Sequence, residues 1–129
     1  MRTTQLPAVL LCLFLAGCSG RNEPVVAHEK PVAHWLEELK QPAPKARKKA
    51  VGALGAIGKA DPAAIPALIG VVKDDRDATV RDQAVLALLN IGPDAKEALP
   101  VLTEAAQSDK DATVRTHATK AVERIRGTK

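Results

Sequence analysis

The chain has 129 residues, of which 46% are hydrophobic but only 2% aromatic. This length suits one modest domain, whose core must come from Ala, Val, Leu and Ile because Trp35 is the only aromatic residue after the N-terminal apolar run. Both cysteines, Cys12 and Cys18, lie near the N-terminus, which excludes disulfides, thiolate zinc sites and cysteine nucleophiles from Ser19 onward. The net charge of +4 is too small an excess to indicate a nucleic-acid-binding protein.

The first residues have the features of an export signal. Arg2 is followed by an apolar stretch of ten residues, Leu6–Leu15, which is too short to span a bilayer because spanning helices need about 20. It ends in Leu15-Ala16-Gly17-Cys18, which resembles the lipobox of bacterial lipoproteins. The resemblance implies acylation of Cys18, cleavage before it, and anchoring to the periplasmic side of the outer or inner membrane. We expect a signal peptide over 1–17, and a lipidated cysteine with a flexible tether over 18–30. An ordinary secretory signal peptide is the alternative.

From Pro31 onward the sequence repeats itself. The segments beginning at Lys45, Thr79 and Thr113 align at a constant spacing of 34 residues. Agreement at this many positions in three copies indicates a repeat architecture. The matched positions are Arg47, Arg81 and Arg115; Ala50, Ala84 and Ala118; Leu54, Leu88 and Val122; Ile57, Ile91 and Ile125.

Each copy has the pattern of two helices. In the second copy, the apolar residues Ile65, Leu68, Ile69 and Val72 recur at i, i+3, i+4 and i+7. A similar apolar stripe follows at Val80, Ala84, Leu88 and Ile91, so the pattern predicts one buried face per helix. Asp77 is placed to cap the second of these helices, and Gly58 and Gly92 follow the last apolar residues of theirs. The prediction is an all-α fold of three helical hairpins, over about 31–58, 62–92 and 95–127.

The motif Asp-x-Asp-Ala-Thr-Val-Arg-x-x-Ala occurs at 75–84 and again at 109–118. It resembles the HEAT repeat, especially the short variety found in phycobilisome-lyase-like proteins, and the resemblance covers about 31–127. A tetratricopeptide array has the same period but requires recurring Trp, Tyr and Phe, which this sequence lacks. The resemblance implies a right-handed α-solenoid. Gln41 stands where the family has Asp, so we expect a weaker capping bond in the first copy.

In HEAT arrays, aligned Asp and Arg side chains bond along the stack. The resemblance therefore implies a structural ladder, in which Asp75 pairs with Arg81 and Asp109 with Arg115, and Arg47 holds the equivalent position in the first copy. A planar guanidinium suits this role because it bridges a carboxylate and neighbouring carbonyls at once. Exposed loop ions that contribute little to stability are the alternative.

The resemblance also implies that the second helices of successive repeats line a concave docking face. Candidate partner contacts are the solvent-facing positions of those helices, with ordinary solvated surface as the alternative for each. A basic run at Lys45–Lys49 is a second candidate contact, with anionic lipid or an acidic partner. The ridge candidates are Lys49, Gln83 and His117; Leu86 and Lys120, with Gly52; and Asn90 and Arg124, with Ala56.

The third copy is more polar than the second. Val85, Leu86 and Leu89 are replaced at the next repeat by Thr119, Lys120 and Glu123. A terminal repeat needs a wettable outer side, so these replacements predict a C-terminal cap at which the array ends. Three repeats are about the minimum for a stable solenoid, which predicts modest stability.

The sequence favours a non-catalytic, membrane-anchored interaction scaffold whose partner is an unidentified protein. It offers no catalytic residues and indicates no cofactor, metal, nucleic acid or small-molecule substrate. The di-iron site of HEAT-fold hydroxylases needs recurring His-Glu pairs, and His28-Glu29 is the only one. An accessory or regulatory subunit of a membrane-associated enzyme is the main alternative. A phycobilin-lyase-like enzyme is the other, although it would need aromatic and large apolar walls.

Overall fold

The computed structural model describes residues 30–127, and within that range the chain is helical with short connections and no strand. The predicted signal peptide, Cys18, the tether up to residue 29 and the pair His28-Glu29 lie outside the described residues. The elements in chain order are α2 (Val32–Glu38), α3 (Pro44–Ile57), α4 (Ala64–Asp74), α5 (Ala78–Ile91), the 3₁₀ segment η1 (Gly92–Ala98), α6 (Leu99–Ser108) and α7 (Ala112–Arg126).

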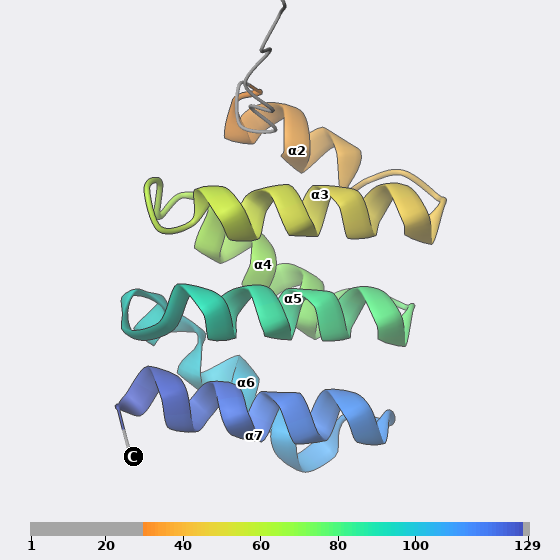
Figure 1. Ribbon diagram of the computed structural model, residues 1–129. Helices are drawn as coiled ribbons and strands as arrows, with labels where there is room; N and C mark the ends of the chain where they lie inside the picture. The colour runs from red at the N-terminus through yellow and green to blue at the C-terminus, as the bar shows by residue number, and fades with distance from the viewer. Residues whose placement is uncertain (1–29, 128–129) are drawn as a thin grey trace, which may run out of the picture.

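The helices form three stacked pairs, arranged in two layers (Figure 1). The second helices of the pairs, α3, α5 and α7, lie side by side in one layer, and α2, α4 and α6 form the other. Contacts between successive second helices are extensive, whereas α4 and α6 meet over a much smaller area. The stack is therefore tighter on the second-helix side. The predicted all-α solenoid is confirmed.

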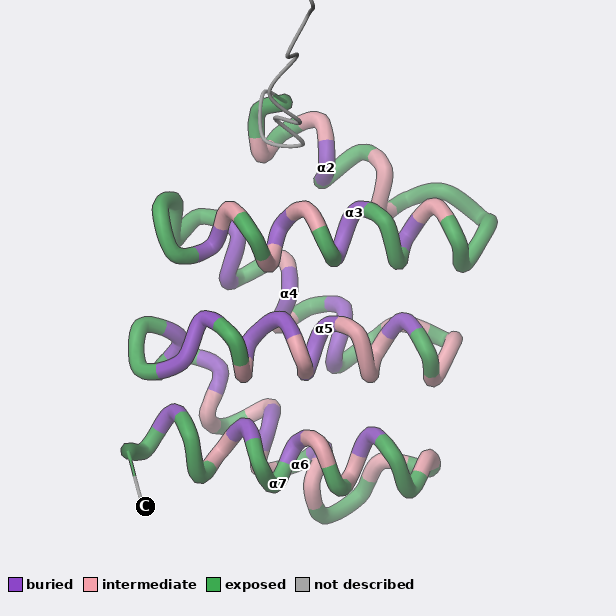
Figure 2. Tube along the Cα trace, viewed as in Figure 1, coloured by how far each residue is buried: buried purple, intermediate pink, exposed green. Residues whose placement is uncertain are grey.

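The core lies between the two layers and is almost entirely aliphatic (Figure 2). Trp35 is the one buried aromatic residue in the described part of the chain, and its indole Nε1 has no hydrogen-bond partner there. Because small and branched side chains fill the core, the helices can approach one another closely. The largest fully buried side chains are Leu54, Ile65, Leu68, Leu88, Leu102 and Ile125.

Aspartates begin two of the three second helices. Asp77 accepts hydrogen bonds from the backbone N–H groups of Thr79 and Val80, at 2.8 and 3.3 Å, which confirms the predicted N-cap. Asp111 caps α7 in the same way. These bonds satisfy N–H groups that have no partner inside the helix.

The first repeat lacks this cap, for a different reason from the one predicted. Helix α3 begins after Ala43, which has no side chain able to accept a hydrogen bond. Ala43 holds the position equivalent to Asp77, one repeat of 34 residues earlier. Gln41 is equivalent to Asp75, a residue that does not cap the helix. The missing cap therefore results from Ala43, and the expectation for Gln41 was wrong.

At Gly55, the absence of a side chain lets α3 lie close to α5. A Cβ atom placed on Gly55 would lie 2.7 Å from the Cβ of Ala87, which is closer than side-chain carbons approach. Gly52, one turn earlier on α3, has open space around the same position. Of these two glycines, only Gly55 is required by helix packing.

The outer side of the third repeat is polar and exposed to solvent. Thr119 and Lys120 are exposed on α7, whereas the equivalent Val85 is fully buried between α5 and its neighbours. The substitution pattern therefore matches the solvent exposure of this helix in the structure. Figure 2 shows that much of α7 is exposed or half-buried.

Candidate interaction surfaces

Two buried ion pairs connect successive repeats. Arg47 donates from Nε and from one terminal amino group to the Asp75 carboxylate, at 2.8 and 3.1 Å. Arg81 donates to Asp109 in the same bidentate way, with both distances 2.9 Å. In each pair, an arginine in the first turn of a second helix binds the loop of the following repeat, 28 positions later.

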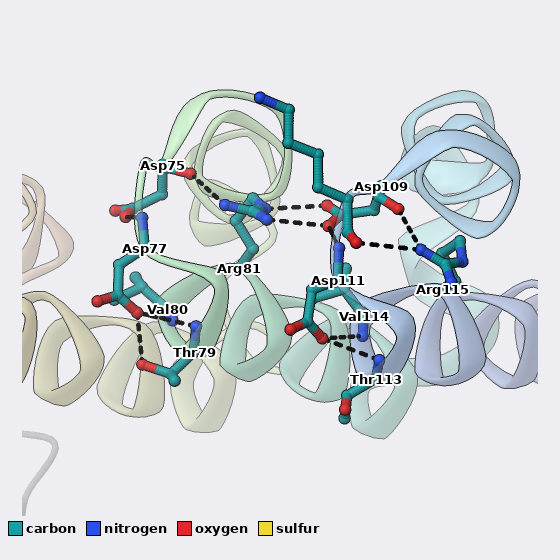
Figure 3. Close-up of polar contacts among 11 residues, drawn as sticks. Asp75, Asp77, Thr79, Val80, Arg81, Asp109, Asp111, Thr113, Val114 and Arg115 are labelled. Atoms are coloured by element: carbon teal, nitrogen blue, oxygen red, sulfur yellow. Dashed lines mark hydrogen bonds and ion pairs between the residues drawn. The ribbon is translucent and has the colours of Figure 1, made fainter.

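The sequence predicted ion pairs within a repeat, Asp75 with Arg81 and Asp109 with Arg115, and this prediction was wrong. Within a repeat, each arginine contacts the aspartate through its backbone carbonyl and not through its carboxylate. Arg81 donates to the backbone carbonyl of Asp75 at 2.9 Å, and Arg115 to the carbonyl of Asp109 at 2.7 Å (Figure 3). The carboxylate of Asp75 also accepts the backbone N–H of Asp77 at 2.9 Å, which turns it away from its own helix and toward the preceding repeat. A guanidinium does bridge a carboxylate and a carbonyl, but the two belong to different repeats.

The paired side chains are largely removed from water. Arg47 and Asp75 are 6% and 8% exposed, and Arg81 and Asp109 are 13% and 7% exposed. The hydrogen bond from Arg81 lowers the pKa of Asp109, and the same bond raises the pKa of Arg81 above its ordinary value. Both groups are therefore charged at neutral pH. Each guanidinium is matched to a carboxylate and to loop carbonyls, so the ladder ties the repeats together.

The predicted ridge of partner contacts lies on α3, α5 and α7, at equivalent positions of helices that stack side by side. Its charged and amide members Lys49, Asn90, Lys120 and Arg124 are exposed. Gln83, Leu86 and His117 are half-buried. On α3 the ridge is smooth, because Gly52 and Ala56 are exposed and have little or no side chain.

His117 is engaged within the protein. Its Nδ1 lies 2.6 Å from Oδ1 of Asp82, so the two side chains form a hydrogen bond between α7 and α5. Because His117 is half-buried and partnered, the expectation of a solvated histidine was wrong. The two residues are 35 positions apart, one repeat plus one residue, and that offset is the signal by which the sequence would have revealed the contact.

A groove of about 500 Å³ lies along α4 and α6, on the opposite layer from the ridge. Val72, Val101 and Ala105 give it an apolar floor, while Lys73, Arg76, Glu104 and Lys110 stand at its rim. Arg81 and Asp109 line it as well, but they are bound to each other.

The basic run Lys45–Lys49 contains two kinds of residue. Lys45, Lys48 and Lys49 are exposed at the start of α3, whereas Arg47 is buried in the ladder. Within residues 30–127, the structure shows no cluster of three or more His, Cys, Asp or Glu side chains able to hold a metal ion. In that same range, no helix has both the length and the apolar character needed to cross a bilayer.

Stacked helical pairs with an aspartate–arginine ladder define an α-solenoid repeat protein. The family model described as HEAT repeats matches residues 32–123, and the chain belongs to this family. HEAT repeats commonly mediate protein–protein interactions, and the family is typically a non-catalytic scaffold. A comparison with curated proteins found no match.

Proposed function

We propose that the protein is a non-catalytic interaction scaffold, held at the bacterial cell envelope by a lipid on Cys18, which binds a partner protein along the concave ridge. The observation that carries this proposal is the layer formed by α3, α5 and α7, in which equivalent positions of three neighbouring helices are all exposed or half-buried. Such a surface is broad and shallow, which suits another protein better than a small molecule.

The chemistry of the ridge favours an acidic partner with an apolar contact. Lys49, Lys120 and Arg124 have no ion-pair partner among residues 30–127. Leu86 is half-buried on the middle helix α5, and Lys120 holds the equivalent position on α7. Positive charge around an accessible leucine attracts carboxylates and buries an apolar side chain at the centre of the contact.

The ridge is tested by replacing Lys49, Leu86 and Arg124 with alanine together. Capture of the partner from detergent-solubilised membranes should be lost, while the far-ultraviolet circular dichroism of the variant should stay that of the unmodified chain. The control replaces three exposed residues outside the ridge, Lys73, Glu97 and Gln107. Capture that survives the ridge variant, or is lost equally in the control, would contradict the proposal.

Anchoring is proposed from the sequence Leu15-Ala16-Gly17-Cys18 and is tested separately. Two or three acyl chains hold a protein stably on a bilayer, because one chain alone gives only marginal binding. Cys18→Ala should abolish labelling by radioactive palmitate and release the protein from the membrane fraction. Cys12→Ala, at the only other cysteine, is the control and should leave both unchanged. Labelling that persists in Cys18→Ala would refute the lipid anchor.

A further inference from the structure

The ladder has a third arginine whose carboxylate-binding side is open. Arg115 is the fourth residue of α7, as Arg47 and Arg81 are of α3 and α5. Its terminal amino group NH1 donates to the carbonyls of Asp109 and Lys110, at 2.7 and 3.2 Å, as in the other repeats (Figure 3). Its Nε and its other amino group have no acceptor among residues 30–127, whereas both groups bind an aspartate in the two preceding repeats.

The open side of Arg115 is already oriented. Two backbone carbonyls hold NH1, and the half-buried side chain leaves the helix at the same position as Arg81. A planar guanidinium fixed at one edge presents its remaining N–H groups in the geometry that a carboxylate accepts through two bonds. Because the side chain is held in place before binding, little rotamer freedom is lost when a carboxylate arrives.

The surroundings indicate what kind of group brings that carboxylate. The hydroxyls of Thr116 and Thr119 donate to backbone carbonyls of their own helix, at 2.9 and 3.0 Å, and both residues are exposed. An apolar helix pair would bury little apolar surface against a polar edge of this kind. The cations Lys110 and Lys120 are exposed near Arg115 in the sequence and make no ion pair within residues 30–127. The edge therefore suits an acidic loop.

A second copy of the chain does not supply the carboxylate by stacking head to tail. The loop position that binds the preceding arginine is Asp75 in the second repeat and Asp109 in the third, but Gln41 in the first. We propose that the edge of α7 around Arg115 binds an aspartate on a loop of a partner protein, through the Nε and amino groups that Arg47 and Arg81 use within the chain. This surface shares Lys120 with the ridge, but the proposed contact is made by Arg115, which is not a ridge residue, and it does not depend on the ridge.

Side-chain nuclear magnetic resonance of the full ¹⁵N-labelled chain in detergent tests the proposal, with the acetylated, amidated peptide Ser-Asp-Lys-Asp as the probe. This peptide copies residues 108–111, the loop that Arg81 binds. At low ionic strength, we expect the Nε–H resonance of Arg115 to shift and saturate with a Kd of about 1–10 mM, because a bidentate bond to a guanidinium that is already oriented is stronger than an ordinary exposed ion pair. Those of Arg47 and Arg81 should not move.

Two controls make the result decisive. The peptide Ser-Asn-Lys-Asn should cause no saturable shift in the unmodified chain. This control does not require a variant protein. Arg115→Lys should weaken binding of the aspartate peptide at least ten-fold, read from backbone amides of residues 109–116. The proposal fails if no saturable shift occurs, if the asparagine peptide acts equally, or if Arg124 and Arg126 respond as strongly as Arg115.

Discussion

Arg81 and Asp109 are 28 positions apart in the chain and are joined by two hydrogen bonds of 2.9 Å, while the same guanidinium donates to the carbonyl of Asp75, six residues before it. One side chain therefore holds two loops, its own and that of the next repeat. The pair Arg47–Asp75 does the same at the preceding junction, with a further bond to the Gln41 carbonyl at 3.0 Å. A short solenoid has few contacts between distant residues, so such bonds weigh heavily in keeping neighbouring repeats together.

Removing one member of a rung should destabilise the protein strongly. Asp109→Asn leaves the Arg81 guanidinium without its carboxylate in a site that is 13% exposed, and the expected loss in free energy of unfolding is about 3 kcal/mol. Urea denaturation followed by circular dichroism measures it. Lys40→Gln breaks an exposed pair with Glu37, with both side chains about 70% exposed, and should change stability by less than about 0.5 kcal/mol. Equal effects of the two variants would contradict a structural ladder.

Acid should weaken the same rung. The pKa of Asp109 is lowered from 3.8 in the folded state by its hydrogen bond with Arg81. A group with a depressed pKa contributes stability that is complete above its unfolded value and is lost as pH falls through its folded value. The difference in free energy of unfolding between the unmodified chain and Asp109→Asn should therefore be constant above about pH 5 and shrink below pH 4. Urea titrations at several pH values check this, and a difference independent of pH would contradict it.

Two glycines on one helix should respond in opposite directions to the same change. Gly55→Ala places a methyl group 2.7 Å from the Ala87 Cβ, so we expect a net loss of about 1–3 kcal/mol, despite the better helix propensity of alanine. Gly52→Ala meets nothing within 4 Å and should gain about 0.5–1 kcal/mol. Chemical denaturation of both variants measures these changes in the free energy of unfolding. Stabilisation by Gly55→Ala would show that α3 and α5 are not closely packed there.

The missing helix cap offers a stabilising substitution. Ala43 precedes α3 with φ −75° and ψ 122°, close to the φ −94° and ψ 120° of the capping residue Asp77. The Ala43→Asp carboxylate should therefore accept hydrogen bonds from backbone N–H groups of the first turn, as Asp77 does, and stabilise the protein by about 0.5–2 kcal/mol. The converse variant, Asp77→Ala, should lose a similar amount. Thermal unfolding detects both changes. An Ala43→Asp variant with unchanged stability would mean that the uncapped first turn of α3 does not limit the stability of the protein.

The aspartate–arginine motif was visible in the sequence, but the sequence placed its partners wrongly. The resemblance to HEAT repeats implied that Arg81 pairs with Asp75, six residues before it; the carboxylate that Arg81 binds is Asp109, in the next repeat. Similarly, His117 read as a solvated position because its equivalents are Lys49 and Gln83, yet it bonds to Asp82 on the neighbouring helix.

The amino-acid sequence by itself determined the period of 34 residues, the all-α fold, the aliphatic core and the Asp77 cap. These features depend on spacing along one chain segment, where helix geometry fixes which residues share a face. Only the tertiary structure decided which aspartates Arg47 and Arg81 bind, why Gly55 but not Gly52 is required, and that two donor groups of Arg115 have no acceptor within residues 30–127. Those outcomes depend on how each helix pair is rotated and shifted against the next, and a repeat pattern alone does not specify that relation.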